Sequence, residues 1–108
     1  RNALFVAERG PEWIGMAVGS RAGDEPDAHL YGMWVDPAWR ARGVGARLVD
    51  EVLGWAGSWG ARSVILSVTE TNAGAAAFYE RLGFVDTGDG HRLREGSDLT
   101  VRVMSRAP

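Results

Sequence analysis

Cysteine is absent from this sequence. Disulfide bonds, thiolate metal sites and a cysteine nucleophile are therefore excluded, and the composition is compatible with an intracellular location. With no cysteine, a thioester intermediate on the protein is also excluded.

Long apolar runs and clusters of positive charge are missing as well. The sequence has no run of about 18 apolar residues and no charged-then-apolar leader, so we expect a cytoplasmic protein without a membrane partner. The basic residues are all arginine, and the formal net charge is -2. Nucleic-acid binders usually carry a clustered basic excess, so nucleic acid is not an expected partner.

The chain does have the size and composition of one compact domain, with 108 residues of which 45% are hydrophobic. We expect a single α+β domain over residues 1–108, with a mixed, mostly antiparallel sheet of about six strands and two helices. The predicted strands cover residues 4–7, 13–18, 29–35, 63–68, 84–87 and 99–104.

Two segments are predicted to be helices from their apolar spacing and from the glycines that follow them. The first starts at Val44, shows apolar residues at helical spacing, and stops at Gly57 and Gly60. The second covers about residues 73–82, and Gly83 stands where a left-handed cap would lie.

The strand at residues 29–35 is apolar on both faces, which favours a central position. Simple alternation places Tyr31 on one face and Trp34 on the other. Pro37 ends the strand because proline cannot donate to a ladder.

A glycine-rich turn then joins this strand to the first helix. It contains Arg40, Arg42, Gly43 and Gly45, and the first amides of a helix attract anions that glycine allows to approach closely. The turn is not a P-loop, which needs Lys followed by Ser or Thr, and Leu48 does not fit a dinucleotide fingerprint. An ordinary solvated turn is the alternative.

This turn matches the pattern Q/R-x-x-G-x-G/A, and residues 72–84 match a second pattern: an asparagine, a small-residue helix, and Phe-Tyr-x-x-x-Gly-Phe. In their order and spacing, the two motifs resemble those of the GCN5-related N-acetyltransferase (GNAT) family. The resemblance is close over residues 30–84 and topological elsewhere.

The resemblance implies a site for acetyl-CoA as co-substrate and no metal. The backbone at Met33, Trp34 and Val35 would bind pantetheine, and the Met33 amide would polarise the acetyl carbonyl. The pyrophosphate would lie on the turn amides, with Arg40 beside it; these amides belong to Arg42, Gly43, Val44, Gly45 and Ala46.

The second motif adds Asn72 and Phe78 as cofactor contacts. Asn72 is also a preferred helix N-cap, and both roles are compatible.

Tyr79 and His29 are the candidate catalytic residues. Tyrosine stays protonated at neutral pH and can protonate the leaving thiolate of coenzyme A, although Tyr79 can also be a core aromatic. His29 stands where some histone-type members carry a glutamate base, and the alternative is a surface or packing histidine.

The predicted function is direct acetyl transfer from acetyl-CoA to a primary amine in a ternary complex, with a small-molecule or protein amine as partner; a homodimer is a further expectation. Two alternatives stay open: a non-catalytic acyl-CoA sensor, and an O-acyl or longer-acyl transferase.

The start of the chain affects what can be predicted about the acceptor site. Arg1 is followed almost at once by an apolar run, and family members cover the amine site with an N-terminal strand and helices. We therefore expect a domain that is incomplete at its N-terminus.

Overall fold

The structure is a computed structural model that describes residues 1–92, 95–96 and 98–108. The described residues form seven β-strands, two α-helices and one 3-10 turn. Contacts within the chain divide it into two compact units, residues 1–64 with 107–108 and residues 65–106.

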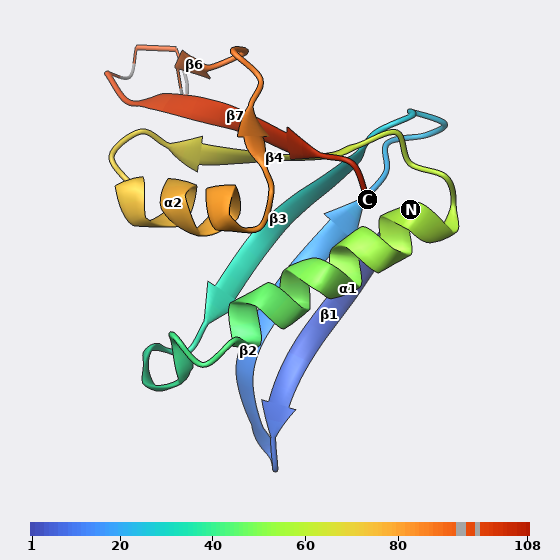
Figure 1. The fold of residues 1–108 in the computed structure, drawn as a ribbon, viewed down its shortest axis with the longest axis vertical. Helices are drawn as coiled ribbons and strands as arrows, with labels where there is room; N and C mark the ends of the chain where they lie inside the picture. Colours follow the sequence, from blue (N-terminus) through green and yellow to red (C-terminus); the bar gives the residue numbers. More distant parts are fainter. Residues whose placement is uncertain (93–94, 97) are drawn as a thin grey trace. The chain divides into compact units, whose positions relative to one another are not determined.

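The first unit is an antiparallel sheet that carries one helix (Figure 1). Its elements, in chain order, are β1 (Asn2–Arg9), β2 (Glu12–Ser20), β3 (Ala28–Val35), η1 (Pro37–Trp39) and α1 (Val44–Ser58). Two glycines of β2 let α1 lie close to the sheet: a Cβ at Gly15 would lie 3.0 Å from the Leu48 side chain, and one at Gly19 would lie 2.7 Å from Trp55. The apolar stripe of α1 is buried, as its spacing predicts: Leu48, Val49, Val52, Leu53 and Ala56.

A β-bulge in β3 changes which side chains share a face. Tyr31 pairs with Val18 and Trp34 pairs with Met16, while the register shifts between these two pairs. Gly32, in the bulge, has a φ of 63°, a conformation that favours glycine. Because Met16 and Val18 are two residues apart in β2, Tyr31 and Trp34 lie on the same face, and the prediction that they lie on opposite faces is wrong. Both are exposed.

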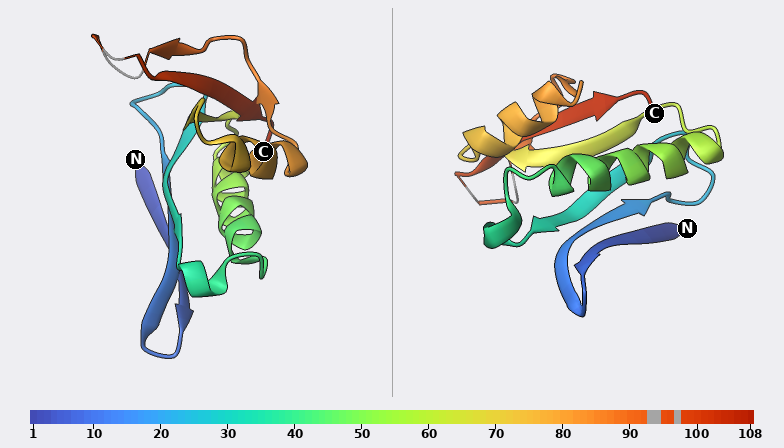
Figure 2. Two further views of the ribbon diagram at one scale, coloured as in Figure 1. Left: turned by 90° about the vertical axis from the view of Figure 1, so that its left-hand side faces the viewer. Right: turned by 60° about the horizontal axis from the view of Figure 1, so that its bottom comes forward.

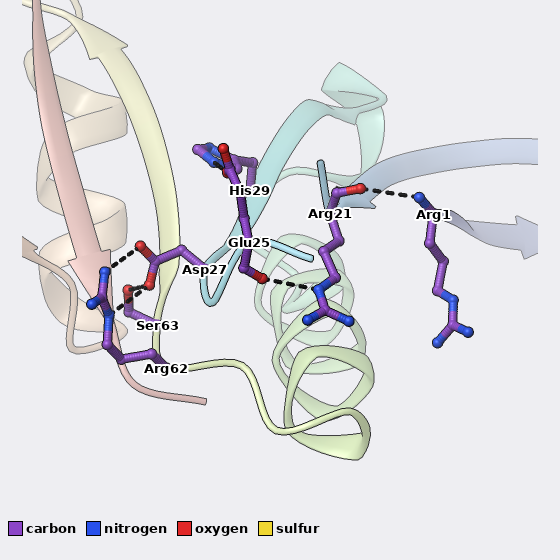
Figure 3. Close-up of polar contacts among 7 residues, drawn as sticks. All are labelled: Arg1, Arg21, Glu25, Asp27, His29, Arg62 and Ser63. Atoms are coloured by element: carbon purple, nitrogen blue, oxygen red, sulfur yellow. Dashed lines mark hydrogen bonds and ion pairs between the residues drawn. The ribbon is translucent and has the colours of Figure 1, made fainter. Parts of the chain in front are cut away.

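The loop before β3 is tied to the segment before β4 (Val64–Thr69), as Figure 3 shows. Asp27 accepts hydrogen bonds from Arg62 Nε at 3.1 Å, Arg62 Nη2 at 2.6 Å and Ser63 Oγ at 2.8 Å. Backbone bonds from Arg62 N to Pro26 O and from Ala28 N to Ser63 O run beside them. This cluster, the Asp27 clamp, holds the starts of β3 and β4 together.

The second unit contains β4 from Ile65 onward, α2 (Ala73–Arg81), β5 (Val85–Asp86), β6 (His91–Arg92) and β7 (Thr100–Arg106). β7 lies between β4 and β5, and β5 and β6 both pair antiparallel with it (Figure 2). Phe84 and Met104 are fully buried in its core.

The predicted elements are present with shifted ends. All six predicted strands and both helices occur, which agrees with the predicted α+β class. β6 was not predicted, since two residues are too few to show a pattern. Within the described residues, no helix is long and apolar enough to cross a membrane.

Candidate functional site

The residues predicted to bind or react fall into two groups, one in each unit. The first unit holds His29, residues 33–35 and the glycine turn, which we define as residues 40–46. The second unit holds Asn72, Phe78 and Tyr79.

The path from β3 to α1 is fixed by local contacts. Asp36 Oδ1 accepts a hydrogen bond from Ala38 N at 2.9 Å, and Pro37 opens the η1 turn. The backbone then becomes left-handed at Ala41, with a φ of 62°, and at Gly43, with a φ of 83°. A non-glycine residue in this conformation is uncommon and is strained, which is frequent at binding sites.

The N-terminus of α1 is left without a cap. Gly43 provides no side-chain hydrogen bond, and the first backbone bond into the helix runs from Arg47 N to Gly43 O at 3.1 Å. In the described part of the chain, the amides of residues 42–46 donate to no protein acceptor. Free amides at the positive end of a 15-residue helix can hold an anion.

Arginine side chains contact the segment that leads into this helix. Arg40 Nε donates to the carbonyl of Val35 at 3.2 Å, which ties the turn to the end of β3. The guanidinium carbon of Arg42 lies 5.3 Å from the ring centre of Trp39, and that of Arg9 lies 5.2 Å from the same ring. Sequence analysis did not identify Trp39 or Arg9; Arg9 is distant in sequence, and no local pattern marks it.

The residues of β3 differ in exposure. Met33 and Val35 are half-buried, while Trp34 is exposed. The register with β2 gives no partner to Gly32 or Met33, because the bulge lies there. The Met33 amide thus lies at an irregular point of the β2–β3 ladder.

His29 lies at the start of β3 with 43% of its side chain exposed. Its Nε2 is 3.9 Å from Glu25 Oε2, a long contact that leaves the imidazole open to solvent (Figure 3).

Asn72 caps α2, as its residue type predicts. Its Oδ1 accepts a hydrogen bond from Ala75 N at 3.0 Å. The capping role is therefore present, and the amide nitrogen of the same side chain stays available for another acceptor.

Tyr79 is held by the C-terminal end of α2. Gly83, with a φ of 94°, donates to Glu80 O, and Phe84 N donates to Tyr79 O. This pair of bonds is a Schellman motif, which usually brings an apolar contact with it. Here the contact is the edge-on packing of Tyr79 and Phe84, whose ring centres are 5.7 Å apart.

The environment of Tyr79 favours its protonated form. The side chain is buried and packs edge-on against Phe78, with ring centres 5.1 Å apart. Burial raises the pKa of the Tyr79 phenol above its ordinary value, because the charged form is poorly solvated there. The phenol thus keeps its proton at neutral pH.

A cleft of about 450 Å³ is lined by residues of the second unit, none of which is a predicted site residue. Its lining carries both charges, and Asp86 is already paired with Arg102 Nε at 2.9 Å.

Comparison with known proteins supports the motif-based prediction. The model of the acetyltransferase (GNAT) family matches residues 1–84. The N-alpha-acetyltransferase RimI of Mycobacterium tuberculosis is 33% identical over 107 residues, which cover 97% of this chain and 66% of that protein. An uncharacterized N-acetyltransferase of the same species is 34% identical over 88 residues, or 82% of this chain.

Solved structures show the same fold. A nourseothricin acetyltransferase is similar with a TM-score of 0.86 and 29% identity, covering 96% of this chain and 64% of that one. A Bacillus anthracis structure, assigned as a streptothricin acetyltransferase and solved with acetyl coenzyme A, has a TM-score of 0.87 and 25% identity, covering 99% and 62%. The chain spans 56% of the length of the uncharacterized relative. The chain belongs to the acetyltransferase (GNAT) family.

Proposed function

We propose that this chain binds acetyl-CoA and acts as an N-acetyltransferase, transferring the acetyl group directly to a primary amine in a ternary complex. The observation that carries the proposal is the uncapped start of α1, where free amides, glycines and arginines coincide. Membership of the GNAT family and the structural likeness to a protein solved with acetyl coenzyme A support it.

In this proposal the pyrophosphate lies on the amides of residues 42–46. Gly43 leaves open space, because a Cβ at this position would meet nothing within 4 Å. Arg42 faces the anion from the turn, while Arg40 keeps the turn attached to β3 through the Val35 carbonyl.

The remaining cofactor contacts are proposed from the family motifs. Pantetheine would bond to the backbone at Met33, Trp34 and Val35, next to the bulge that interrupts the ladder at Gly32 and Met33. Asn72 and Phe78 of the second motif would contact it as well.

The proposed chemistry uses one proton donor of the chain. The neutral amine nitrogen attacks the thioester carbonyl carbon, the Met33 amide stabilises negative charge on the carbonyl oxygen, and the carbon–sulfur bond then breaks. The departing thiolate takes the proton of the Tyr79 phenol. The surplus proton of the amine leaves through His29 or through water.

Two measurements test this function. Calorimetry with coenzyme A tests binding, and mass spectrometry of a panel of amines incubated with acetyl-CoA tests transfer. Acetylated amine together with free thiol supports the proposal. Binding with no transfer to any amine favours the sensor, transfer to hydroxyls or of longer acyl groups favours the other alternative, and absence of binding contradicts the proposal as a whole.

We further propose that residues outside this chain complete the acceptor side. The chain spans only 56% of its uncharacterized relative, and the sheet of the first unit exposes apolar side chains on one face, including Leu4, Tyr31 and Trp34. A longer protein that includes preceding residues should acetylate faster than the 108 residues alone, with equal affinity for coenzyme A. Equal turnover of both would contradict this.

A further inference from the structure

Two arginines from distant parts of the first unit lie against one indole ring. Arg9 ends β1, Arg42 belongs to the glycine turn, and Trp39 ends the η1 turn between β3 and α1. The guanidinium carbons are 5.2 Å and 5.3 Å from the ring centre, within the range of cation–π contacts. Both arginines are exposed, and Trp39 is half-buried.

The backbone that carries the ring is fixed by the η1 turn. The η1 turn is closed by Asp36, which accepts from Ala38 N, and by Pro37, whose backbone angle is preset. Trp39 N donates to Asp36 O at 2.8 Å. The half-buried ring of Trp39 thus lies against the two exposed guanidinium groups and can support both.

The positively charged guanidinium groups of Arg9 and Arg42 lie against one ring and repel each other, and a nearby anion reduces this repulsion. Arg62 and Arg102 are paired with Asp27 and Asp86. Across residues 1–92, 95–96 and 98–108, by contrast, no ion pair joins Arg9 or Arg42 to a carboxylate. Arg42 belongs to the glycine turn whose amides have no protein acceptor, and Arg9 stacks on the same ring as Arg42, so both unpaired cations belong to the neighbourhood of the proposed phosphate site.

We propose that Arg9 is a phosphate-binding residue for the nucleotide half of coenzyme A, and that Trp39 is the positioning residue that holds Arg9 and Arg42 toward it. This inference rests on the proposed function. Coenzyme A carries a pyrophosphate and a separate 3′-phosphate, and a phosphate on either can pair with a guanidinium through charge-assisted hydrogen bonds.

The first test compares Arg9→Ala with the matched control Arg21→Ala. Arg21 also stacks on a tryptophan, with its guanidinium carbon 4.3 Å from the ring centre of Trp59, just after the C-terminal end of α1. Calorimetry with coenzyme A should show a loss of affinity of about threefold to tenfold for Arg9→Ala, and the same measurement is repeated with dephospho-coenzyme A. The control should match the wild type. The salt dependence of binding should also become shallower in Arg9→Ala alone.

The comparison of coenzyme A with dephospho-coenzyme A shows which phosphate Arg9 binds. A loss with coenzyme A only assigns Arg9 to the 3′-phosphate, and a loss with both assigns it to the pyrophosphate; either result supports the proposal. Equal affinities of Arg9→Ala and Arg21→Ala would overturn it while leaving the proposed function intact. A wild-type protein that binds neither ligand overturns both.

The positioning role of Trp39 is tested by an aromatic rescue. Trp39→Leu should weaken coenzyme A binding by at least as much as Arg9→Ala, because both guanidinium groups lose their support, whereas Trp39→Phe should recover most of the affinity. Adding Arg9→Ala to Trp39→Leu should then cost less than it does in the wild type. Full additivity of the two changes would contradict a shared role.

Discussion

The two helices of this chain begin in opposite ways. α2 starts behind Asn72, whose side chain accepts a hydrogen bond from Ala75 N. α1 starts behind Gly43, which is left-handed and offers no side-chain acceptor. A side-chain cap contributes about 1 kcal/mol relative to alanine but only a few tenths of a kcal/mol relative to glycine, so α1 gives up little stability and keeps its positive end free for a ligand.

This difference suggests a division of roles. The open start of α1 suits the binding of an anion, and the closed start of α2 suits a rigid helix that carries Tyr79. Changes near α1 are therefore expected to act on cofactor affinity, and changes in α2 on rate or stability.

The largest expected effect is on turnover, from Tyr79→Phe. It removes the proton donor but keeps the ring that packs against Phe78 and Phe84, so kcat should fall by about 10²- to 10⁴-fold while coenzyme A affinity stays within about twofold. Steady-state kinetics and calorimetry measure the two quantities. Equal rates would exclude Tyr79 from the mechanism.

The pH dependence of turnover and of stability tests the same role of Tyr79. Burial raises the pKa of Tyr79, so the acid form persists above the ordinary value of about 10 and the step that it assists slows as pH rises through the raised pKa. The fold loses stability over the same range, because the phenol of the unfolded chain ionises first. Tyr79→Phe should remove both effects.

Gly45→Glu should have the next largest effect, a loss of coenzyme A affinity of about 100-fold or more. It places a negative charge at the amides where the pyrophosphate is proposed to lie. Gly54→Glu is the matched control, since it lies in the same helix and a Cβ there meets nothing within 4 Å. Position 43 is less suitable, because its φ of 83° strains any side chain.

Calorimetry of both variants gives the comparison, and circular dichroism confirms that each keeps its helices. If Gly45→Glu binds coenzyme A with unchanged affinity, the cofactor does not bind at the start of α1. The uncapped start of α1 and the capped start of α2 would then not differ in function.

The elements of this chain were predictable because their signals are local. The apolar spacing from Val44 to Trp55 predicts α1, and Gly83 and Asn72 predict the two ends of α2 from the conformations that these residue types favour. The family motifs, which are also local, identified the glycine turn and Tyr79 as candidates.

Features that depend on contacts between distant residues were not predictable. The bulge at Gly32 reverses the alternation of β3, and a glycine inside a strand pattern only hints at it. The stacking of Arg9 on Trp39 and the pairing of Asp27 with Arg62 join residues separated by 30 and 35 positions. No periodicity reports such pairs.

Two substitutions of Asn72 distinguish its role as a helix cap from its proposed contact with the cofactor. Asn72→Ala should lower the free energy of unfolding by about 1 kcal/mol, because Ala75 N loses its acceptor. Asn72→Asp keeps an equally good cap and should keep the stability, but it lacks the amide donors proposed to face pantetheine. We expect it to weaken coenzyme A binding by about tenfold.

Denaturant titration and calorimetry on the two variants distinguish the roles. If Asn72→Asp binds coenzyme A as the wild type does, Asn72 is a cap alone, and α2 takes no part in cofactor binding through it.

The smallest expected effect comes from the Asp27 clamp, whose hydrogen bonds join residues outside both helices and which should affect stability only. Asp27→Asn weakens the hydrogen bonds from Arg62 and Ser63, so Tm at neutral pH should fall by a few degrees, on the order of 5 °C. Coenzyme A affinity should not change. Asp24→Asn, in the same exposed loop, is the control.

The pH dependence of stability tests whether the charge of Asp27 stabilises the fold. Hydrogen bonds from Arg62 hold the pKa of the Asp27 carboxyl below its usual value, so its contribution to stability is present above the unfolded pKa of about 3.9 and is lost as pH falls through the folded pKa. The difference in Tm between the wild type and Asp27→Asn should therefore be constant between about pH 5 and about pH 7, and should shrink below about pH 4. A difference that does not change on acidification would show that the clamp acts through its shape and backbone bonds rather than through the charge of Asp27.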